Sequence, residues 1–226
     1  FMLITILAVI VSLIGFISVT YNGTHDYTYS TYIVSMLVWL SAANLVLALI
    51  RTIHGRVNVT LICDYLIVLC VVQCSLALII DGIPSVKEFV DSFLSGQGFM
   101  GKNEHRLYGI GCSLDVAGTR FCAILLMCIY QIVQISSKQE LDEKRKFWHM
   151  LWYLSAFMFI SIVGNMIART TTIGVALAFL YLLILTRPFS IISIEKHKLI
   201  WRMTGIMLFV AICFTVLFYN ISPVFK

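Results

Sequence analysis

The chain has 226 residues and a formal net charge of +5, with 60% of its residues apolar and only 12% charged. Soluble domains carry about a quarter charged residues, so this composition excludes a soluble globular domain and predicts an all-α, polytopic transmembrane helix bundle. We expect the lipid bilayer as partner and no nucleic acid, because a basic excess in membrane proteins usually reflects loop orientation. No repeat or linker divides the sequence, which predicts a single transmembrane domain over residues 1–226.

A helix needs about 20 predominantly apolar residues to cross a bilayer. Seven apolar blocks meet this requirement, one of them marginally. In chain order they are Met2–Val19, Tyr32–Ile50, Val59–Ile80, Val116–Ile135, Trp148–Met166, Thr171–Thr186 and Leu199–Phe218. The first block lacks the basic flank of a signal peptide, so we expect a retained helix; the start at Phe1 leaves open a processed product or a fragment.

Residues 148–186 are almost continuously apolar, and this segment must be broken. As one helix, at about 1.5 Å per residue, it would reach nearly twice the hydrocarbon thickness of a bilayer. Gly164-Asn165 and Arg169 with its three threonines offer the only place for a break. The sequence therefore predicts a tight helical hairpin whose tip carries Arg169.

The basic residues predict the orientation of the helices. Most of them fall in alternate loops, which we expect to be cytoplasmic together with the amino terminus. These are Arg51, Arg56, Lys138, Lys144, Arg145, Lys146, Arg187, Lys196, Lys198 and Arg202. The others fall on the opposite, extracytoplasmic side, where positive charge is disfavoured: Lys87, Lys102, Arg106, Arg120, Arg169 and Lys226.

Residues 84–94 predict a short amphipathic helix in an extracytoplasmic loop. Val86, Phe89, Val90 and Phe93 form an apolar stripe, and charged residues occupy the other side. We expect this helix to lie along the membrane surface.

The longest polar, glycine-rich segment spans residues 101–120 and contains Arg106, Asp115 and Arg120. Ionisable groups at the edge of a membrane helix are costly and are candidates for function. A guanidinium stays charged and can grip phosphate oxygens with two hydrogen bonds, so several arginines at the outer edge suit the pyrophosphate of a lipid-linked substrate. The alternative is structural, with Arg120 paired to Asp115 and Arg106 paired to Glu104.

Three further features bear on the chemistry of the chain. His105 is a candidate base for activating an acceptor hydroxyl, and the alternative is a loop histidine without a role. Asp64, inside the third apolar block, is either a proton or ion site or a residue at the membrane interface. The seven cysteines show no metal-ligand spacing, and we expect no metal and no cofactor.

Two short motifs carry a family resemblance. Arg106-Leu-Tyr-Gly109, followed by Asp115-Val-Ala-Gly118 and an apolar helix, resembles the first extracytoplasmic signature of the bacterial O-antigen ligase/polymerase family. Gly164-Asn165 to Ala168-Arg169-Thr170, leading into residues 173–185, is similar to the second signature of that family, an arginine that opens a helix. The order, spacing and common predicted side of the two motifs carry the resemblance across most of the chain.

The resemblance implies a multi-pass, metal-independent glycosyltransferase of the bacterial inner (cytoplasmic) membrane. It would be an O-antigen polymerase or ligase that transfers undecaprenyl-pyrophosphate-linked oligosaccharide at the outer face, with a chain-length regulator or other envelope proteins as further partners. Arg106 and Arg169, with Arg120, would bind the pyrophosphate and stabilise it as the leaving group. The supporting residues would be Asp115, Asn165 and Gly109.

The chain departs from the family pattern in several places. The family often carries Asn-Pro-Asn-like residues at positions 114–117 and Ser-Arg where Ala168-Arg169 stands. Family members continue into a large extracytoplasmic loop, and Tyr219–Lys226 resembles its beginning, so we expect the chain to be truncated before that loop. The alternatives are a transporter or flippase for an anionic or lipid-linked substrate, with Asp64 coupling protons, and a membrane fragment without activity of its own.

The polymerase or ligase hypothesis makes a geometric prediction. The guanidinium groups of Arg106 and Arg169 should lie on the same outer side and face a shared cavity. Arg120 should approach that cavity or pair with Asp115.

Overall fold

The computed structural model describes residues 2–94, 107–109, 114–137, 142–186, 198, 200–202 and 204–205. The chain forms two compact units, residues 1–58 and residues 59–226, and each is described by itself. The elements are α-helices, which confirms the predicted all-α class. The single transmembrane domain stays a prediction.

The first unit is a hairpin of α1 (Met2–Asn22) and α2 (Tyr32–His54). The Ser12 hydroxyl oxygen accepts a hydrogen bond from the backbone N–H of Ile33 at 2.9 Å. Beside it, a Cβ on Gly15 would lie 2.8 Å from the carbonyl carbon of Tyr29, so only glycine lets the loop approach α1 this closely. Most apolar side chains of both helices point outward, the pattern of helices whose solvent is lipid.

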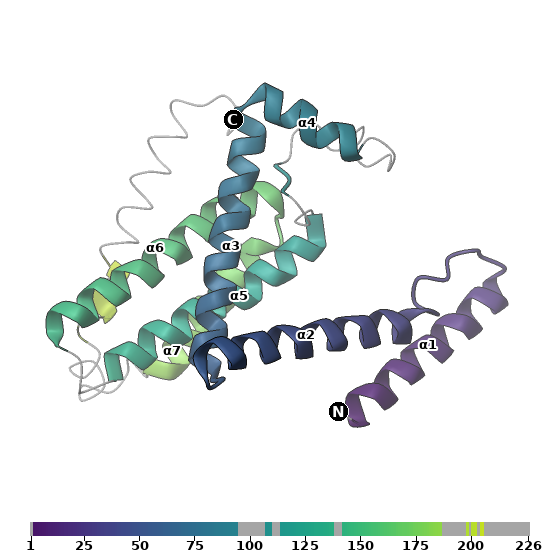
Figure 1. Cartoon of the computed structure of the whole chain (residues 1–226), viewed down its shortest axis with the longest axis horizontal. Helices are drawn as coiled ribbons and strands as arrows, with labels where there is room; N and C mark the ends of the chain where they lie inside the picture. The colour runs from purple at the N-terminus through teal and green to yellow at the C-terminus, as the bar shows by residue number, and fades with distance from the viewer. Residues whose placement is uncertain are drawn as a thin grey trace. The chain divides into compact units, whose positions relative to one another are not determined.

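The second unit contains α3 (Val59–Gly82), α4 (Pro84–Leu94), α5 (Leu114–Ser137), α6 (Glu143–Ile167) and α7 (Thr171–Thr186). Successive long helices run in alternating directions, so each chain reversal lies at one of two ends (Figure 1). The most extensive packing of α5 is against α6 and α7, and α3 packs on both α5 and α6. The core of this unit is therefore organised around α5.

Helices α5 and α6 are more deeply buried inside the protein than α3 is. About half of the apolar window of α5 and of α6 is buried inside the protein, 50% and 56%, against 28% for α3. Helices α3, α5, α6 and α7 each supply large core side chains that are almost fully buried: Ile67, Phe121, Leu125, Ile160, Ile167 and Leu182. Since α3 has a buried and an exposed side, we infer that its exposed side contacts lipid.

Glycines allow α5 and α7 to approach very closely. A Cβ on Gly174 of α7 would lie 2.6 Å from the Cα of Cys122 on α5 and 2.7 Å from its sulfur. A Cβ on Gly118 of α5 would overlap the hydroxyl oxygen of Thr170, just before α7. Small residues of this kind let helix backbones approach in membrane proteins, where packing rather than the hydrophobic effect drives helix association.

The predicted spans agree with the helices where these are described. Five helices, α1, α2, α3, α5 and α6, are long and apolar enough to cross a membrane, so the chain is an integral membrane protein with several spans and lies in a lipid bilayer. The sixth predicted span is α7, a shorter apolar helix of 16 residues. Most of the seventh, Leu199–Phe218, lies outside the described residues, although residues 200–202 and 204–205 are helical.

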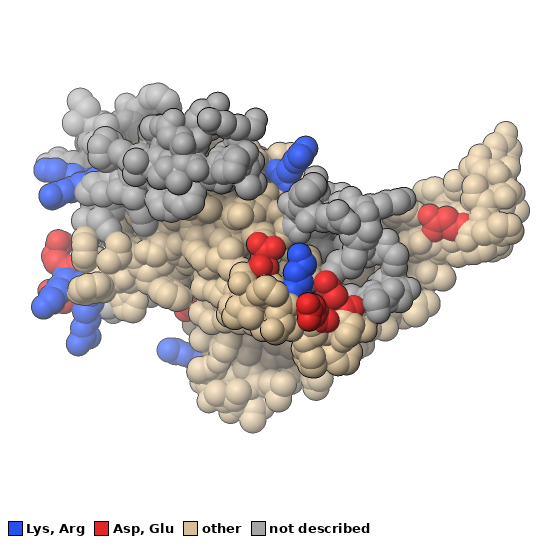
Figure 2. Space-filling view, turned by 90° about the horizontal axis from the view of Figure 1, so that it is seen from above, with Lys and Arg blue, Asp and Glu red and all other residues tan. Residues whose placement is uncertain are grey.

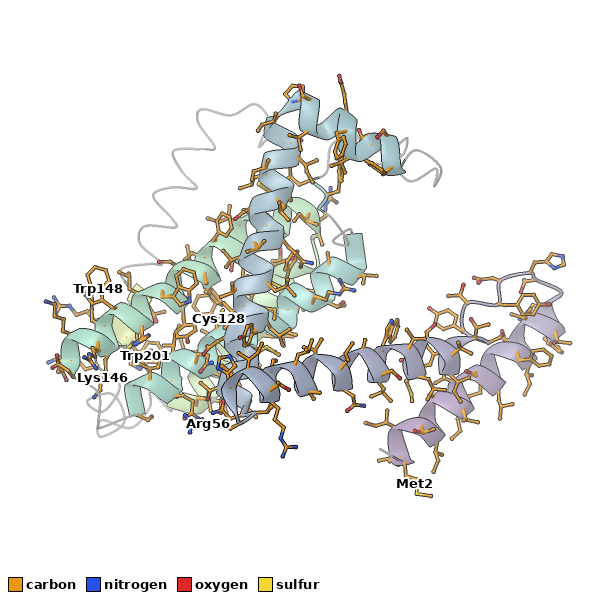
Figure 3. All side chains as sticks on the ribbon, viewed as in Figure 1. Met2, Arg56, Cys128, Lys146, Trp148 and Trp201 are labelled. Carbon is orange, nitrogen blue, oxygen red and sulfur yellow. The ribbon has the colours of Figure 1, made fainter. Side chains whose placement is uncertain are left out.

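On the face shown in Figure 2, the described charged side chains gather in separate groups among uncharged residues. At the start of α6, the acidic and basic residues 143–146 precede Trp148, which is 60% exposed. Lys146, Trp148 and Trp201 lie toward the same end of the second unit (Figure 3). Aromatic residues beside basic clusters are typical of a membrane interface. Which side of the membrane this end faces stays a prediction.

The amphipathic helix is present as α4, with the predicted bounds Pro84–Leu94. It follows α3 almost without interruption and packs against that helix. Val86 and Val90 are half-buried, whereas Phe89 and Phe93 are exposed and pair edge to face at 5.1 Å between ring centroids. Two exposed aromatic rings agree with a helix on the membrane surface, a location that stays a prediction.

The α5–α7 contact generates a first prediction. Gly174→Ala should lower the free energy of unfolding by about 1–3 kcal/mol, because the new methyl group meets backbone that cannot rotate away. Thermal unfolding in detergent micelles measures the effect. Gly82→Ala is the matched control, since a Cβ there meets nothing within 4 Å, and it should leave stability unchanged or slightly raised. Equal stability of Gly174→Ala and the wild type would contradict the close contact.

Candidate functional site

The predicted break between residues 148 and 186 is confirmed. Helix α6 ends at Ile167, Ala168 is extended with φ −143° and ψ 120°, and α7 begins at Thr171. The backbone N–H of Ala168 still donates to the Gly164 carbonyl oxygen at 2.7 Å, which closes the last turn of α6. Arg169 lies at the tip of this α6–α7 turn.

Side chains of the same motif fold the turn back onto α6. The Thr171 hydroxyl donates to the Gly164 carbonyl oxygen at 3.0 Å, inside the core. The Thr172 hydroxyl donates to Asn165 Oδ1 at 2.6 Å, and Asn165 Nδ2 donates to the Ser161 carbonyl oxygen at 2.8 Å. These bonds satisfy polar groups that lipid could not satisfy, so they give Thr171, Thr172 and Asn165 a structural reason to be there.

Helix α5 closes the turn from the other side. The Cys122 thiol donates to the Thr170 carbonyl oxygen at 3.3 Å. Beside it, Gly118 would clash with Thr170 and Ala168 if it carried a side chain. The backbone on both sides of Arg169 is thus held between α5 and α6.

Arg169 itself is exposed. Its guanidinium group has no hydrogen-bond or ion-pair partner among the residues that the structure describes. The first N–H groups of α7 donate to carbonyl oxygens within the turn: Thr171 to Ala168, Thr172 to Arg169 and Ile173 to Thr170, at 3.0–3.1 Å. Because these backbone donors are occupied, binding of an anion here would depend on the guanidinium group.

Arg120 is exposed on α5. Arg120 is two residues after Gly118 and two residues before Cys122, and a step of two residues turns about 200° around the axis of a helix. It therefore lies on the side of α5 away from the α6–α7 turn, next to Val116, which is 62% exposed. The side chain of Asp115 lies outside the described residues, so the predicted Arg120–Asp115 pair stays a prediction, as does a shared cavity with Arg169.

His105 and Arg106 also lie outside the described residues, but the three residues that follow them are placed. Leu107 is buried and belongs to the same core as Phe121 and Ala168. Tyr108 donates a hydrogen bond of 2.5 Å to Asp91 Oδ1 on α4, and Gly109 is buried. The segment that carries Arg106 is therefore tied to α4 and to the core immediately after that residue.

Sequence analysis did not identify Asp91 as a partner of this motif. Burial and the hydrogen bond to the nearby Asp91 carboxylate both raise the pKa of Tyr108 above that of an ordinary tyrosine. The phenol therefore stays a donor to Asp91 throughout the neutral pH range.

A second polar cluster lies inside the bundle around Asp64 of α3. Asp64 Oδ1 accepts hydrogen bonds from Gln131 Nε2 on α5 at 2.8 Å and from the Tyr153 hydroxyl on α6 at 2.7 Å. Gln131 Nε2 also donates to the Thr60 carbonyl oxygen at 2.8 Å. Asp64 thus connects three helices. The signal that could have revealed this was Gln131, the amide inside an otherwise apolar block.

The described cysteines form no disulfide with one another, and Cys63, Cys70, Cys74 and Cys128 are buried. Cys128 lies where α3 and α5 overlap in Figure 3. Among the described residues, no three His, Cys, Asp or Glu side chains gather as a group that could hold a metal ion. The four buried cysteines act as small core residues.

Comparison with protein-family models, curated proteins and solved structures found no match to this chain. The resemblance to the O-antigen ligase/polymerase family therefore rests on its two short motifs. The chain is an integral membrane protein with several spans, and its function has to be argued from its own residues.

The Tyr108–Asp91 hydrogen bond generates a second prediction. Tyrosine in an unfolded chain ionises near a pH of about 10, whereas the raised pKa of Tyr108 keeps it protonated in the folded protein. Its contribution to stability should be complete below that pH and be lost as the pH rises toward the folded pKa. A spectroscopic phenolate titration of wild type and Tyr108→Phe measures this. A tyrosine that ionises in the ordinary range and is absent from Tyr108→Phe would contradict the contact.

Proposed function

We propose that the protein binds the pyrophosphate of a lipid-linked oligosaccharide at the α6–α7 turn and transfers the oligosaccharide as an O-antigen polymerase or ligase. One observation carries this proposal. Arg169 is exposed, its guanidinium group has no partner among the described residues, and it sits on a turn that is fixed by hydrogen bonds and by α5. An unneutralised cation at the end of membrane helices is costly and is a candidate for ligand binding.

The geometry of the turn supports anion binding in a second way. The backbone around Arg169 is already ordered, so binding would cost little conformational entropy beyond that of the arginine side chain. A planar guanidinium offers two parallel donors to phosphate oxygens, and it is more weakly hydrated than an ammonium group. Both properties suit a pyrophosphate whose lipid tail remains in the bilayer.

Arg106 joins the site in this proposal. The neighbouring Leu107 packs into the core that also contains Ala168 of the turn. This placement supports an approach of Arg106 toward the same end of the bundle. Arg120 has a weaker claim, because it lies on the side of α5 away from the turn.

The reaction would take place at the outer face of the inner membrane. An acceptor hydroxyl attacks the anomeric carbon, His105 takes the hydroxyl proton, and the bond between that carbon and the phosphate oxygen breaks. The pyrophosphate leaves with the bonding electrons, and Arg169 and Arg106 stabilise the added negative charge. An arginine pair placed on the leaving group supplies what a metal ion supplies in other transferases.

The alternative is a transporter or flippase in which the same arginine holds an anionic or lipid-linked substrate. Both functions need Arg169 for binding, but only the transferase needs it to stabilise a leaving group. An Arg169 variant that blocks movement of the lipid-linked substrate across the membrane, while leaving transfer of substrate already outside intact, would favour the transporter.

Substitution of Arg169 gives the third prediction. Arg169→Lys keeps the charge but loses the two parallel donors, and a hydrogen bond to a charged group contributes roughly 1.5–3 kcal/mol, so the transfer rate should fall about ten- to a hundred-fold. Arg169→Ala should cost more. The measurement is surface-polysaccharide chain length beside membrane abundance, in cells in which the gene for the protein is deleted and each variant is supplied.

The membrane abundance of the variants distinguishes a binding role of Arg169 from a structural role. Both variants should accumulate normally, because removing an exposed charge breaks no contact seen among the described residues. Arg145→Ala, at the opposite end of α6, is the matched control and should leave chain length unchanged. A normal polysaccharide chain length in Arg169→Ala at normal membrane abundance would contradict the proposed role of Arg169.

A further inference from the structure

The hydrogen bonds around Asp64 leave one buried atom unmatched. Gln131 is fully buried, and both hydrogens of its amide nitrogen are used, one on Asp64 Oδ1 and one on the Thr60 carbonyl oxygen. Its Oε1 is buried and has no hydrogen-bond partner among the described residues. A buried acceptor without a donor costs free energy, more so in a bundle surrounded by lipid.

Exchanging the positions of the oxygen and the nitrogen in the Gln131 amide does not give Oε1 a hydrogen-bond donor. Oε1 would then face Asp64 Oδ1 and the Thr60 carbonyl oxygen, two acceptors, and both contacts would be lost. The present orientation is therefore the one that the surroundings require. Oε1 therefore still needs a hydrogen-bond donor.

The charges near Asp64 point to the nature of that donor. The titratable groups that face Asp64 are Cys63 on α3 and Tyr153 on α6, with Cys128 of α5 next to Tyr153. None of these groups is a cation, and no Lys, Arg or His pairs with Asp64 among the described residues. Helix α4 begins after the end of α3 that is remote from Asp64.

We propose that Asp64 and Gln131 form a proton-binding site in which Asp64 Oδ2 carries the proton and donates it to Gln131 Oε1. A carboxylic acid and a primary amide match each other in this way, with two antiparallel hydrogen bonds. The structure already contains one of them, from Gln131 Nε2 to Asp64 Oδ1. The second satisfies the unmatched acceptor.

Proton uptake at this site makes and breaks only bonds between oxygen and hydrogen. A hydronium ion gives its proton to Oδ2 and leaves as water, and release is the reverse step. Asp64 is only partly buried, so the proton has a way in that does not pass through the core. The protonated pair joins α3 to α5 by two side-chain bonds, and the Tyr153 hydroxyl adds α6. The packing of these three helices therefore depends on the proton, independently of the proposed transferase function.

Infrared difference spectroscopy of the full chain in lipid nanodiscs tests the site. As the pH falls, a carboxylic-acid C=O band should appear, shift in D₂O, and be absent from Asp64→Asn. Asp81→Asn, at the other end of α3, is the control and should keep the band. Gln131→Leu should move the band to the frequency of an acid without an amide partner. A spectrum with no Asp64-dependent band, or a band that Gln131→Leu leaves in place, would overturn the proposal.

Tyr153→Phe supplies a second test that does not depend on how Gln131→Leu folds. The Tyr153 hydroxyl donates to Asp64 Oδ1, and a hydrogen bond to a carbonyl oxygen lowers its stretching frequency, so removing the hydroxyl should move the band to higher frequency. An unchanged frequency, or a shift to lower frequency, would count against the assigned geometry. Sodium chloride at constant pH should not remove the band; if it does, the site takes a metal cation and the proton proposal is wrong.

Thermal unfolding gives the third readout. In Asp64→Asn the new amide can donate to Gln131 Oε1 as the protonated acid does, so its unfolding temperature should match that of the wild type at low pH and show no dependence on pH over the range in which the band titrates. A variant that is less stable than the wild type at every pH would show that Asp64 acts only as a carboxylate.

Discussion

The rest of the second unit depends on the close approach of α5 and α7. Gly174 packs against Cys122 and Gly118 packs against Thr170, so the two backbones meet where a side chain on either glycine would force them apart. This contact fixes the place at which the chain leaves α6 and enters α7. Since lipid gives no hydrophobic drive for helices to associate, such backbone contact and the polar bonds beside it hold the bundle together. The position of Arg169 is a consequence of that packing.

Helix α5 serves two polar sites. Near its beginning it supports the α6–α7 turn through Gly118 and Cys122. Thirteen residues beyond Gly118, about 20 Å along a helix, Gln131 binds Asp64. The proposed anion site and the proposed proton site therefore lie toward opposite ends of one central helix. A change at either site that shifts α5 along its axis or rotates it would move the residues of α5 at the other site. The helix therefore offers a physical route for coupling between the two sites.

Much of the local architecture could be predicted from the sequence. Apolar block lengths predicted the helices, amphipathic spacing predicted the bounds of α4, and hydrocarbon thickness required the break at Gly164–Arg169. The amide of Gln131 inside an apolar block was a signal of a polar contact, but its pairing with Asp64 could not be predicted, and neither could that of Tyr153, because packing of distant segments brings these residues together. The same holds for Asp91 and Tyr108. Helical periodicity does separate Arg120 from Gly118 and Cys122, and applying it to α5 would have weakened the expectation that Arg120 faces Arg169.

The most direct measurement is photo-crosslinking of the full chain in vesicles with an undecaprenyl pyrophosphate analogue that carries a photoreactive group beside the pyrophosphate. Mass spectrometry of the labelled peptides should place the label on residues 164–172 and on the first turns of α5. Unlabelled undecaprenyl pyrophosphate should compete for that labelling, and Arg169→Ala should abolish it. Label confined to the end of the bundle that contains Asp64, or equal labelling of wild type and Arg169→Ala, would contradict an anion site at the α6–α7 turn.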